Sequence, residues 1–180
     1  DITAWVWGGG LEDSTAEFSA VRTEEVDLRD PDDVSDRLAD TAPDVIYHLA
    51  AASSVAASWN DPRLAFDVNL YGTLNLLDAV RTRCPQAVVV APTSGEIYGP
   101  CSDGRPHRED ESLDPRSPYA VSKAAQDLLL AQAFRASDIA TVRLRPFVHT
   151  GPGRDQIHPA NRTVSRFGLH DLRVHRASPQ

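Results

Sequence analysis

Tyr119 and Lys123 are the residues of this 180-residue sequence whose types and spacing most directly suggest proton-transfer chemistry. They are four positions apart, so on a helix both side chains lie on one face. A tyrosine with a pKa of about 10 is a poor base at neutral pH, but a nearby ammonium group favours the phenolate and lowers that pKa. If the Ser94 hydroxyl reaches the same substrate oxygen, Tyr119 exchanges the proton, Lys123 tunes the phenol and Ser94 orients the oxygen.

These three side chains cannot supply a hydride, so an interconversion of alcohol and ketone at this site requires a cofactor. Glu96, two residues after Ser94, offers a carboxylate that could act as a base. Each residue also has a plainer interpretation. A Tyr-x-x-x-Lys spacing can be a surface pair on a helix, Glu96 can be an exposed carboxylate in a turn, and His48 is expected to bond to backbone rather than to act as a catalyst.

The elements that must position these residues alternate between strands and helices. Apolar and β-branched runs predict strands at 2–7, 24–28, 44–49, 87–91 and 140–147, and helical spacing predicts helices at 32–40, 64–83 and 117–136. Asp32 or Asp33 is expected to cap the first helix, and Ser117 the last. The strand at 44–49 is too apolar at its centre for an edge exposed to water. This alternation predicts an α/β, Rossmann-like fold with a doubly wound parallel sheet covered on both faces.

Ligands bind such sheets beyond the carboxyl ends of the strands. The residues that follow successive predicted strands are Asp27 and Leu28, the segment 48–51, the segment 93–96 and the segment 145–147. We therefore expect them at one edge. Ala50 and Ala51 would let the backbone approach a ligand closely, and Asp27 would accept a hydrogen bond from a hydroxyl or exocyclic amine.

The charge and composition of the chain argue against nucleic acid, membranes and metal ions as partners. The 26 acidic residues against 18 basic ones give a net charge of −8, which argues against a nucleic-acid partner, because binding to a duplex is mainly phosphate neutralisation. No apolar run is long enough to cross a membrane, and the first ten residues lack the basic region and apolar core of a signal peptide, so we expect a cytoplasmic protein without a membrane partner. The two cysteines and the histidines have no ligand spacing, so no metal site is expected.

Five short segments occur in a characteristic order: HLAA (48–51), DVNLYGT (67–73), TSGEIYG (93–99), SPYAVSK (117–123) and GPG (151–153). Together they resemble the extended short-chain dehydrogenase/reductase family, the NAD(P)-dependent nucleotide-sugar epimerases, dehydratases and reductases. The similarity covers roughly residues 20 to 154. HLAAASSVAASW followed by FDVNLYGTLNLLDAVR is most similar to the branch of GDP-mannose 4,6-dehydratase and GDP-4-keto-6-deoxy-mannose reductase, and slightly more to the reductase.

The resemblance implies a role for each matching residue. Ser94, Tyr119 and Lys123 would be the catalytic Ser/Thr, Tyr and Lys, and Glu96 falls where dehydratases keep the glutamate that takes the sugar C5 proton. Gly95 stands where the dTDP-glucose dehydratases have an acidic residue, so that relative is not favoured. The residues that would contact the cofactor are Asp27, Leu28, Leu49, Ala50, Ala51, Asn69, Tyr119 and Lys123. Ser53 and Ser94 would contact a nucleotide-sugar substrate, although Asn69 can also simply cap or pack.

Three departures from the family pattern limit what the resemblance implies. The family opens with a strand and a GxxGxxG turn that cradles the pyrophosphate, and Gly8-Gly9-Gly10 does not have that spacing. We interpret 2–7 as the family's second strand, with the first strand and its turn lacking; alternatively it is the first strand, with Asp27 at the ribose. Val148 replaces a common Asn, and no sugar domain follows Gly153.

We therefore expect residues 1–154 to form a partial dinucleotide-binding domain and 155–180 a tail of unknown structure. The positions that distinguish NAD from NADP are Trp7 and glycines, so either cofactor is allowed. The implied function is nucleotide-sugar reduction or dehydration, with a homodimer as the full-length form and an inactive chain in this truncated form. The alternatives are a 4-epimerase of the same family and a non-catalytic fragment or interaction module.

Overall fold

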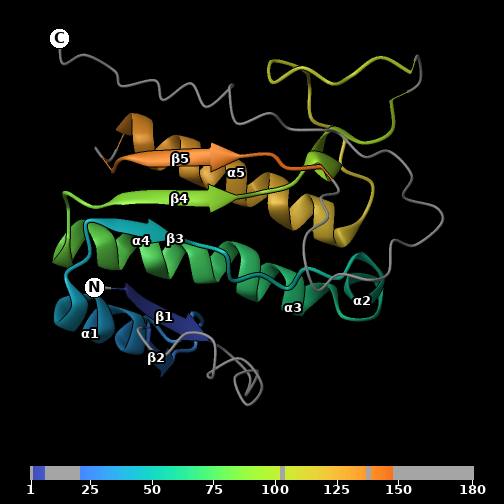
Figure 1. Cartoon of the computed structure of the whole chain (residues 1–180). Coiled ribbons are helices and arrows are strands. Elements are labelled where there is room, and N and C mark those ends of the chain that lie inside the picture. The colour runs from blue at the N-terminus through green and yellow to red at the C-terminus, as the bar shows by residue number, and fades with distance from the viewer. Residues whose placement is uncertain (1, 7–20, 102–103, 137–138, 148–180) are drawn as a thin grey trace, which may run out of the picture.

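Strands and helices alternate along the chain in the predicted order (Figure 1). The structure is a computed structural model, and it describes residues 2–6, 21–101, 104–136 and 139–147. The elements are β1 (Ile2–Val6), β2 (Val21–Glu25), α1 (Pro31–Thr41), β3 (Val45–Tyr47), α2 (Val55–Asn60), α3 (Pro62–Phe66), the π-helical turn η1 (Asp67–Tyr71), α4 (Gly72–Arg83), β4 (Val88–Pro92), the 3-10 turn η2 (Gly95–Tyr98), α5 (Pro118–Ala136) and β5 (Thr141–Leu144). The predicted glycine turn at 8–10, Val148, the GPG segment and the tail lie outside the described residues.

Short polar side chains set where the helices begin. The Ser117 hydroxyl accepts a hydrogen bond from the Ala120 amide at 3.1 Å, which confirms it as the cap of α5. The predicted cap of α1 was wrong by two or three positions: the Asp30 carboxylate accepts from the amides of Asp32 and Asp33 at 3.0 and 3.2 Å. The reason is Pro31, which fits the first helical position because it has no amide proton to satisfy.

The predicted helix at 64–83 is divided, and a short helix that was not predicted, α2, precedes it. Ser54 caps α2 by accepting from the Ala57 amide at 3.1 Å, and Asp61 caps α3 by accepting from the Leu64 amide at 3.0 Å. A π-helical turn at 67–71 then joins α3 to α4. Such turns are often found at functional sites.

The strands form two parallel sheets in the described part of the chain, not the single sheet that was predicted. The β1–β2 sheet pairs Trp5 with Glu24, and the β3–β4–β5 sheet has β4 at its centre. The prediction of a buried strand at 44–49 was wrong, because Val45 is 46% exposed and Tyr47 is 69% exposed. Their strand pairs with β4 on one side only, and its other side faces a cavity rather than a neighbouring strand.

The second strand also lies earlier than predicted, at Val21–Glu25 rather than 24–28. Val26 and Leu28 are 2% and 8% exposed, so the apolar alternation that suggested a strand reflects burial in a turn. The other strands lie within or within one residue of their predicted ranges.

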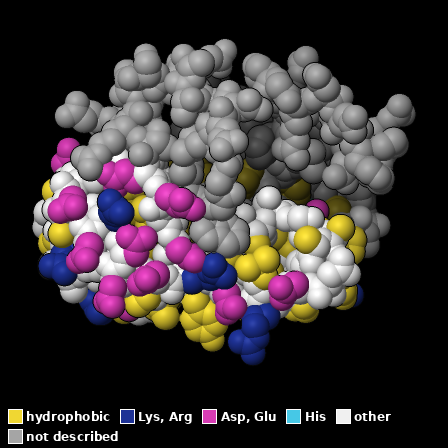
Figure 2. Space-filling model, turned by 90° about the horizontal axis from the view of Figure 1, so that it is seen from below, with side chains coloured by type: hydrophobic (Ala, Val, Ile, Leu, Met, Phe, Trp, Pro, Cys, Tyr) yellow, Lys and Arg dark blue, Asp and Glu magenta, His cyan; other side chains and the backbone are white. Residues whose placement is uncertain are grey.

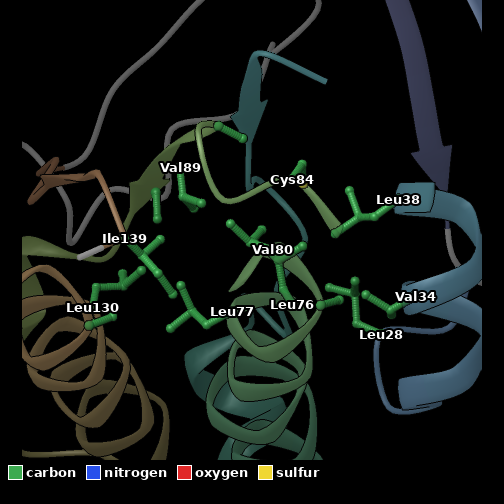
Figure 3. Packing of buried hydrophobic residues seen from close by; sticks show 14 of the residues in the cluster. Leu28, Val34, Leu38, Leu76, Leu77, Val80, Cys84, Val89, Leu130 and Ile139 are labelled. Atoms are coloured by element: carbon green, nitrogen blue, oxygen red, sulfur yellow. The ribbon is translucent and has the colours of Figure 1, made fainter. Parts of the chain in front are cut away.

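The main core lies between the helices and the sheet (Figure 3). Val34 and Leu38 of α1 face Leu76 and Val80 of α4, while Leu130 of α5 closes the far side. Burial of a side chain of this size contributes about 1.5–3 kcal/mol, so this layer fixes α1, α4 and α5 against one another. In Figure 1, α4 and α5 lie behind the β3–β4–β5 sheet, on the same face of it.

The surface on the α1 side is acidic. Figure 2, which views the molecule from below, shows Asp and Glu side chains gathered where α1 lies. Among the described residues, no helix is both long and apolar enough to cross a membrane.

Candidate active site

The carboxyl ends of β3 and β4 bring the predicted site residues to one edge of the sheet (Figure 1). Ser94 follows β4 by two residues and is 7% exposed. Its hydroxyl accepts from the Glu96 amide at 3.1 Å and so caps η2. The Gly95 amide donates to the Pro146 carbonyl at 2.8 Å, which ties this turn to the residues that follow β5.

Tyr119 is the phenol of the site, in the first turn of α5. Its phenol lies close enough to the Ser94 hydroxyl and to the exposed Glu96 carboxylate for both groups to affect its pKa. Burial raises the pKa of Tyr119, and the Glu96 charge raises it further, while the Ser94 hydrogen bond lowers it. The net shift is upward, so the expected lowering by Lys123 is wrong for this structure: the phenol is protonated at neutral pH.

Lys123 lies one turn further along α5 and is 3% exposed. Its ammonium donates a hydrogen bond to the Pro92 carbonyl oxygen at 2.9 Å. Burial lowers the pKa of Lys123 to about 8. The ammonium therefore binds the end of β4 instead of tuning Tyr119.

Asn69 supports the site from the π-helical turn. Its amide accepts from the Ala52 amide at 2.8 Å and donates to the Ala52 carbonyl at 3.2 Å and to the Ser122 hydroxyl at 2.9 Å. The side chain is fully buried, so these bonds hold the loop after β3 against α5. Direct contact of Asn69 with a cofactor stays a prediction.

His48 lies at the end of β3 and is 4% exposed. We expected its side chain to bond to the backbone, but its Nε2 is hydrogen-bonded to the Thr73 hydroxyl at 2.8 Å. Burial lowers the pKa of His48 to about 4, and the Lys123 charge lowers it as well. His48 is therefore neutral at physiological pH and serves as a buried partner of α4.

Five of the residues predicted to contact the cofactor line one cavity of about 1100 Å³. They are Asp27, Leu28, Leu49, Ala50 and Ala51. The Asp27 carboxylate accepts from the Arg29 guanidinium at 2.6 Å and from the Arg29 amide at 2.9 Å. Leu49 is 70% exposed, and Ser53, which was predicted to contact the substrate, is also exposed. The part of this cavity beyond the carboxyl ends of β2 and β3, where small apolar residues lie beside a carboxylate, fits the adenosine part of a dinucleotide.

A buried carboxylate next to the site was missed from the sequence. Asp127 is fully buried and accepts hydrogen bonds from Thr93, Arg143 and Arg145. Two signals could have found it. Asp127 is four residues after Lys123, on the same helix face, and the two arginines are two positions apart at the end of a strand, on one face.

The arrangement offers a hydroxyl and a phenol in contact, with a carboxylate and an ammonium nearby. Within the described ranges, no group of three or more His, Cys, Asp or Glu side chains could hold a metal ion. The residues fit proton transfer to or from a substrate oxygen, beside a cavity suited to a dinucleotide.

The chain is similar to proteins with this kind of site. Residues 11–169 match the family described as GDP-mannose 4,6 dehydratase. A GDP-6-deoxy-D-mannose reductase from Pseudomonas aeruginosa is 36% identical over 145 residues, which are 78% of this chain and 47% of that protein. The chain therefore spans about half the length of this curated relative.

Solved structures agree. The structure of RMD from Pseudomonas aeruginosa complexed with NADPH superposes with a TM-score of 0.69 at 30% identity, covering 86% of this chain and 56% of that one. A UDP-glucose 4-epimerase from Thermus thermophilus, in complex with NAD, gives a TM-score of 0.72 at 34% identity, covering 78% and 46%. The chain is thus α/β with a Rossmann-like fold, and it belongs to the NAD-dependent epimerase/dehydratase family, the extended short-chain dehydrogenases/reductases, in the branch of GDP-mannose dehydratase and RMD.

Proposed function

We propose that the whole protein is an NAD(P)-dependent nucleotide-sugar oxidoreductase of the GDP-4-keto-6-deoxy-mannose reductase or GDP-mannose 4,6-dehydratase type. The observation that carries this proposal is the placement of the Tyr119 phenol close to Ser94 and Glu96, with buried Lys123 one turn along the same helix. NAD or NADP, when bound, would supply or accept a hydride at the sugar C4. The similarity to a reductase solved with NADPH supports this assignment.

Tyr119 is the residue that exchanges a proton with the substrate oxygen in this proposal. Because its pKa is raised, the phenol carries a proton at neutral pH and can give it to the substrate oxygen as a ketone becomes an alcohol. In the opposite direction the phenolate oxygen of Tyr119 takes the proton back from the substrate hydroxyl as the alcohol becomes a ketone. Ser94 orients the substrate oxygen, and Lys123 fixes α5 to β4 so that the phenol keeps its place.

The dehydratase form of this proposal and one alternative within the family, a 4-epimerase, use the same residues. Glu96, exposed and next to Tyr119, would take the C5 proton in a dehydration. A 4-epimerase would use Tyr119 in both directions. The half-length match supports a different alternative, in which this chain alone is a non-catalytic fragment or interaction module.

The cavity supports the proposal that a strand is lacking between the two sheets. Residues 3–5 of β1 line it on one side, Val45–Tyr47 of β3 line it on the other, and Leu76 is at its floor. Both strands are parallel to their neighbours and have no partner on this side among the described residues. A strand running in the same direction would satisfy both edges and cover the exposed Tyr47.

The whole protein is also proposed to form a homodimer. Exposed apolar side chains lie on the two long helices. They are Tyr71, directly before α4, Leu74 on α4, and Val121 and Leu128 on α5. A second copy of the chain would cover them. We propose, further, that residues 1–154 are part of the dinucleotide-binding domain, that 155–180 lie outside it, and that the protein acts in the cytoplasm.

Two measurements test the function. In the longer polypeptide that contains this chain, Tyr119→Phe should lose most of the NADPH-dependent reduction of GDP-4-keto-6-deoxy-mannose and keep its NADPH affinity. Tyr71→Phe is the matched control, because it removes a hydroxyl away from Ser94 and keeps the ring on the proposed dimer face, and it should change neither. Unchanged turnover in Tyr119→Phe removes Tyr119 from the mechanism. Fluorescence titration of this chain with NADPH and NADH addresses the fragment alternative, which micromolar binding would contradict.

A further inference from the structure

Asp127 is an anion placed in the interior next to the site. Burial alone would raise its pKa, but hydrogen bonds and charge from Arg145 and Arg143 offset that effect, so the net pKa is lowered and the carboxylate is ionised. Arg145 approaches from Nε at 2.9 Å and from Nη2 at 2.7 Å, a two-pronged contact, whereas Arg143 makes a single bond of 2.7 Å.

Arg145 also reaches beyond this carboxylate. Its Nη1 donates to the Tyr98 hydroxyl at 2.6 Å and to the Glu109 carbonyl at 2.9 Å. Its guanidinium carbon also lies 5.3 Å from the centre of the Tyr98 ring. Arg145 therefore joins four parts of the chain: the end of β5, α5, the η2 turn and the loop at 105–111.

The η2 turn is fixed from a second side by aromatic packing. The Tyr98 ring stacks on His107 at 5.1 Å and on Phe147 at 6.5 Å between centroids. A Cβ at Gly95 would lie 2.6 Å from the Phe147 ring, so glycine allows this ring to rest on the turn. Arg145 contacts this turn through its hydrogen bond to Tyr98, and the turn begins directly after Ser94.

We propose that Arg145 is a positioning residue, which holds the turn carrying Ser94 and Glu96 in register with the α5 helix carrying Tyr119. The proposal rests on the proposed function, because it assigns Arg145 to the geometry of that site. Asp127 lies one turn beyond Lys123 on α5, so the Arg145 contact spans from the helix of the phenol to the turn of the serine. Arg145 itself contacts Asp127 and Tyr98, and it acts on the site residues indirectly through them.

The titration of Tyr119 reports this register. The charged group that acts on the Tyr119 phenol is the Glu96 carboxylate on η2, whereas Lys123, one turn along the same helix, donates to the Pro92 carbonyl. α2 contributes Ser58, whose hydroxyl accepts from the Tyr119 amide at 3.1 Å. If η2 shifts, the Ser94 hydrogen bond is lost, and the Tyr119 signal should move toward the value of a protein without that hydroxyl.

The experiment uses this chain labelled with 13Cζ tyrosine and needs neither cofactor nor turnover, so its outcome is separate from that of the activity assay. Ser94→Ala sets the Tyr119 chemical shift and titration midpoint for a lost hydrogen bond. Arg145→Gln should move Tyr119 to that reference, with a higher midpoint than wild type. Arg143→Gln, which removes one bond to the same carboxylate, should leave Tyr119 at the wild-type value.

Tyr98→Phe is a second test in case Arg145→Gln does not fold. It removes only the hydrogen bond between Arg145 and Tyr98 and keeps both ion pairs of Asp127. It should move Tyr119 in the same direction as Arg145→Gln. The proposal is overturned if Tyr98→Phe leaves Tyr119 at its wild-type value, or if Arg143→Gln and Arg145→Gln move it equally. In the longer polypeptide, Arg145→Gln should lower kcat more than it raises KM.

Discussion

The Lys123 ammonium donates a 2.9 Å hydrogen bond to the carbonyl oxygen of Pro92. Pro92 ends β4, two residues before Ser94, so this bond attaches the helix that carries the phenol to the strand that presents the serine. The buried charge also acts on His48 at the end of β3. One amine thus influences both strand ends that form the site.

Replacing Lys123 by Met should raise the pKa of His48. The ammonium charge disfavours the imidazolium, and its removal leaves burial as the main cause that keeps this pKa below 6.5. NMR titration of the imidazole signals measures the change. Arg135→Met is the control, because residue 135 is about 18 Å further along the helix axis and should leave His48 unaffected. An unchanged His48 titration in Lys123→Met would refute the coupling.

His48 should make the protein less stable in mild acid. Its folded-state pKa of about 4 lies below the unfolded value of about 6.5, so the unfolded chain takes up the proton first as the pH falls. Stability is therefore lost between pH 6.5 and 4, by roughly 3 kcal/mol in total. His48→Gln keeps a donor for Thr73 and removes this titration. Urea unfolding at about pH 7 and about pH 4.5 should show a smaller loss for the variant, and equal losses would count against the assignment.

Local sequence signals predicted the helices well and the exposure of β3 poorly. The Ser117 cap and the Pro118 start of α5 depend only on neighbouring residues, so the pattern was sufficient. The apolar run at 44–49 predicted a buried strand because such runs usually have strands on both sides. In the described chain the neighbour on one side is absent, and no property of the run itself could indicate that.

Gly99 should tolerate no side chain. Its φ of 73° and ψ of −163° belong to a region used almost solely by glycine, and a Cβ there would overlap the Asp114 carbonyl oxygen. Gly99→Ala should therefore cost about 3 kcal/mol of unfolding free energy. Gly104 shares the φ of 73° but has no atom within 4 Å of a Cβ, so Gly104→Ala should cost only about 1 kcal/mol. Urea denaturation of both variants separates the overlap from the backbone conformation, and equal costs would show that the overlap contributes nothing.

Leu76→Ala should destabilise the chain by about 2–5 kcal/mol, because the side chain is 1% exposed at the centre of the core. Leu49→Ala, at a position that is 70% exposed, should change the unfolding free energy by no more than about 0.5 kcal/mol without cofactor. Chemical denaturation checks both. Comparable losses would mean that Leu76 does not lie in a packed core.

The site was predicted in part. Ser94 and Tyr119 were brought together from motifs 25 positions apart, because strand ends and helix starts meet at one sheet edge. The electrostatics were not predictable in the same way. The raised pKa of Tyr119 depends on burial and on Glu96, and the Lys123 contact with Pro92 depends on how α5 lies against β4. Neither follows from a spacing of four residues.

The division between the β1–β2 and β3–β4–β5 sheets has a consequence for unfolding. In the described chain the two parts are connected through the helices, by packing of α1 on α4 and by bonds such as Asn75 to the Leu28 carbonyl at 2.9 Å and Arg83 to Ser35 at 3.0 Å. Among these described residues, backbone ladders do not run across the boundary. Subglobal opening should therefore release β1, β2 and α1 as one cooperative unit while the amide protons of β4 stay protected from exchange. The boundary between the two sheets should thus open at a lower free energy than the β3–β4–β5 sheet itself.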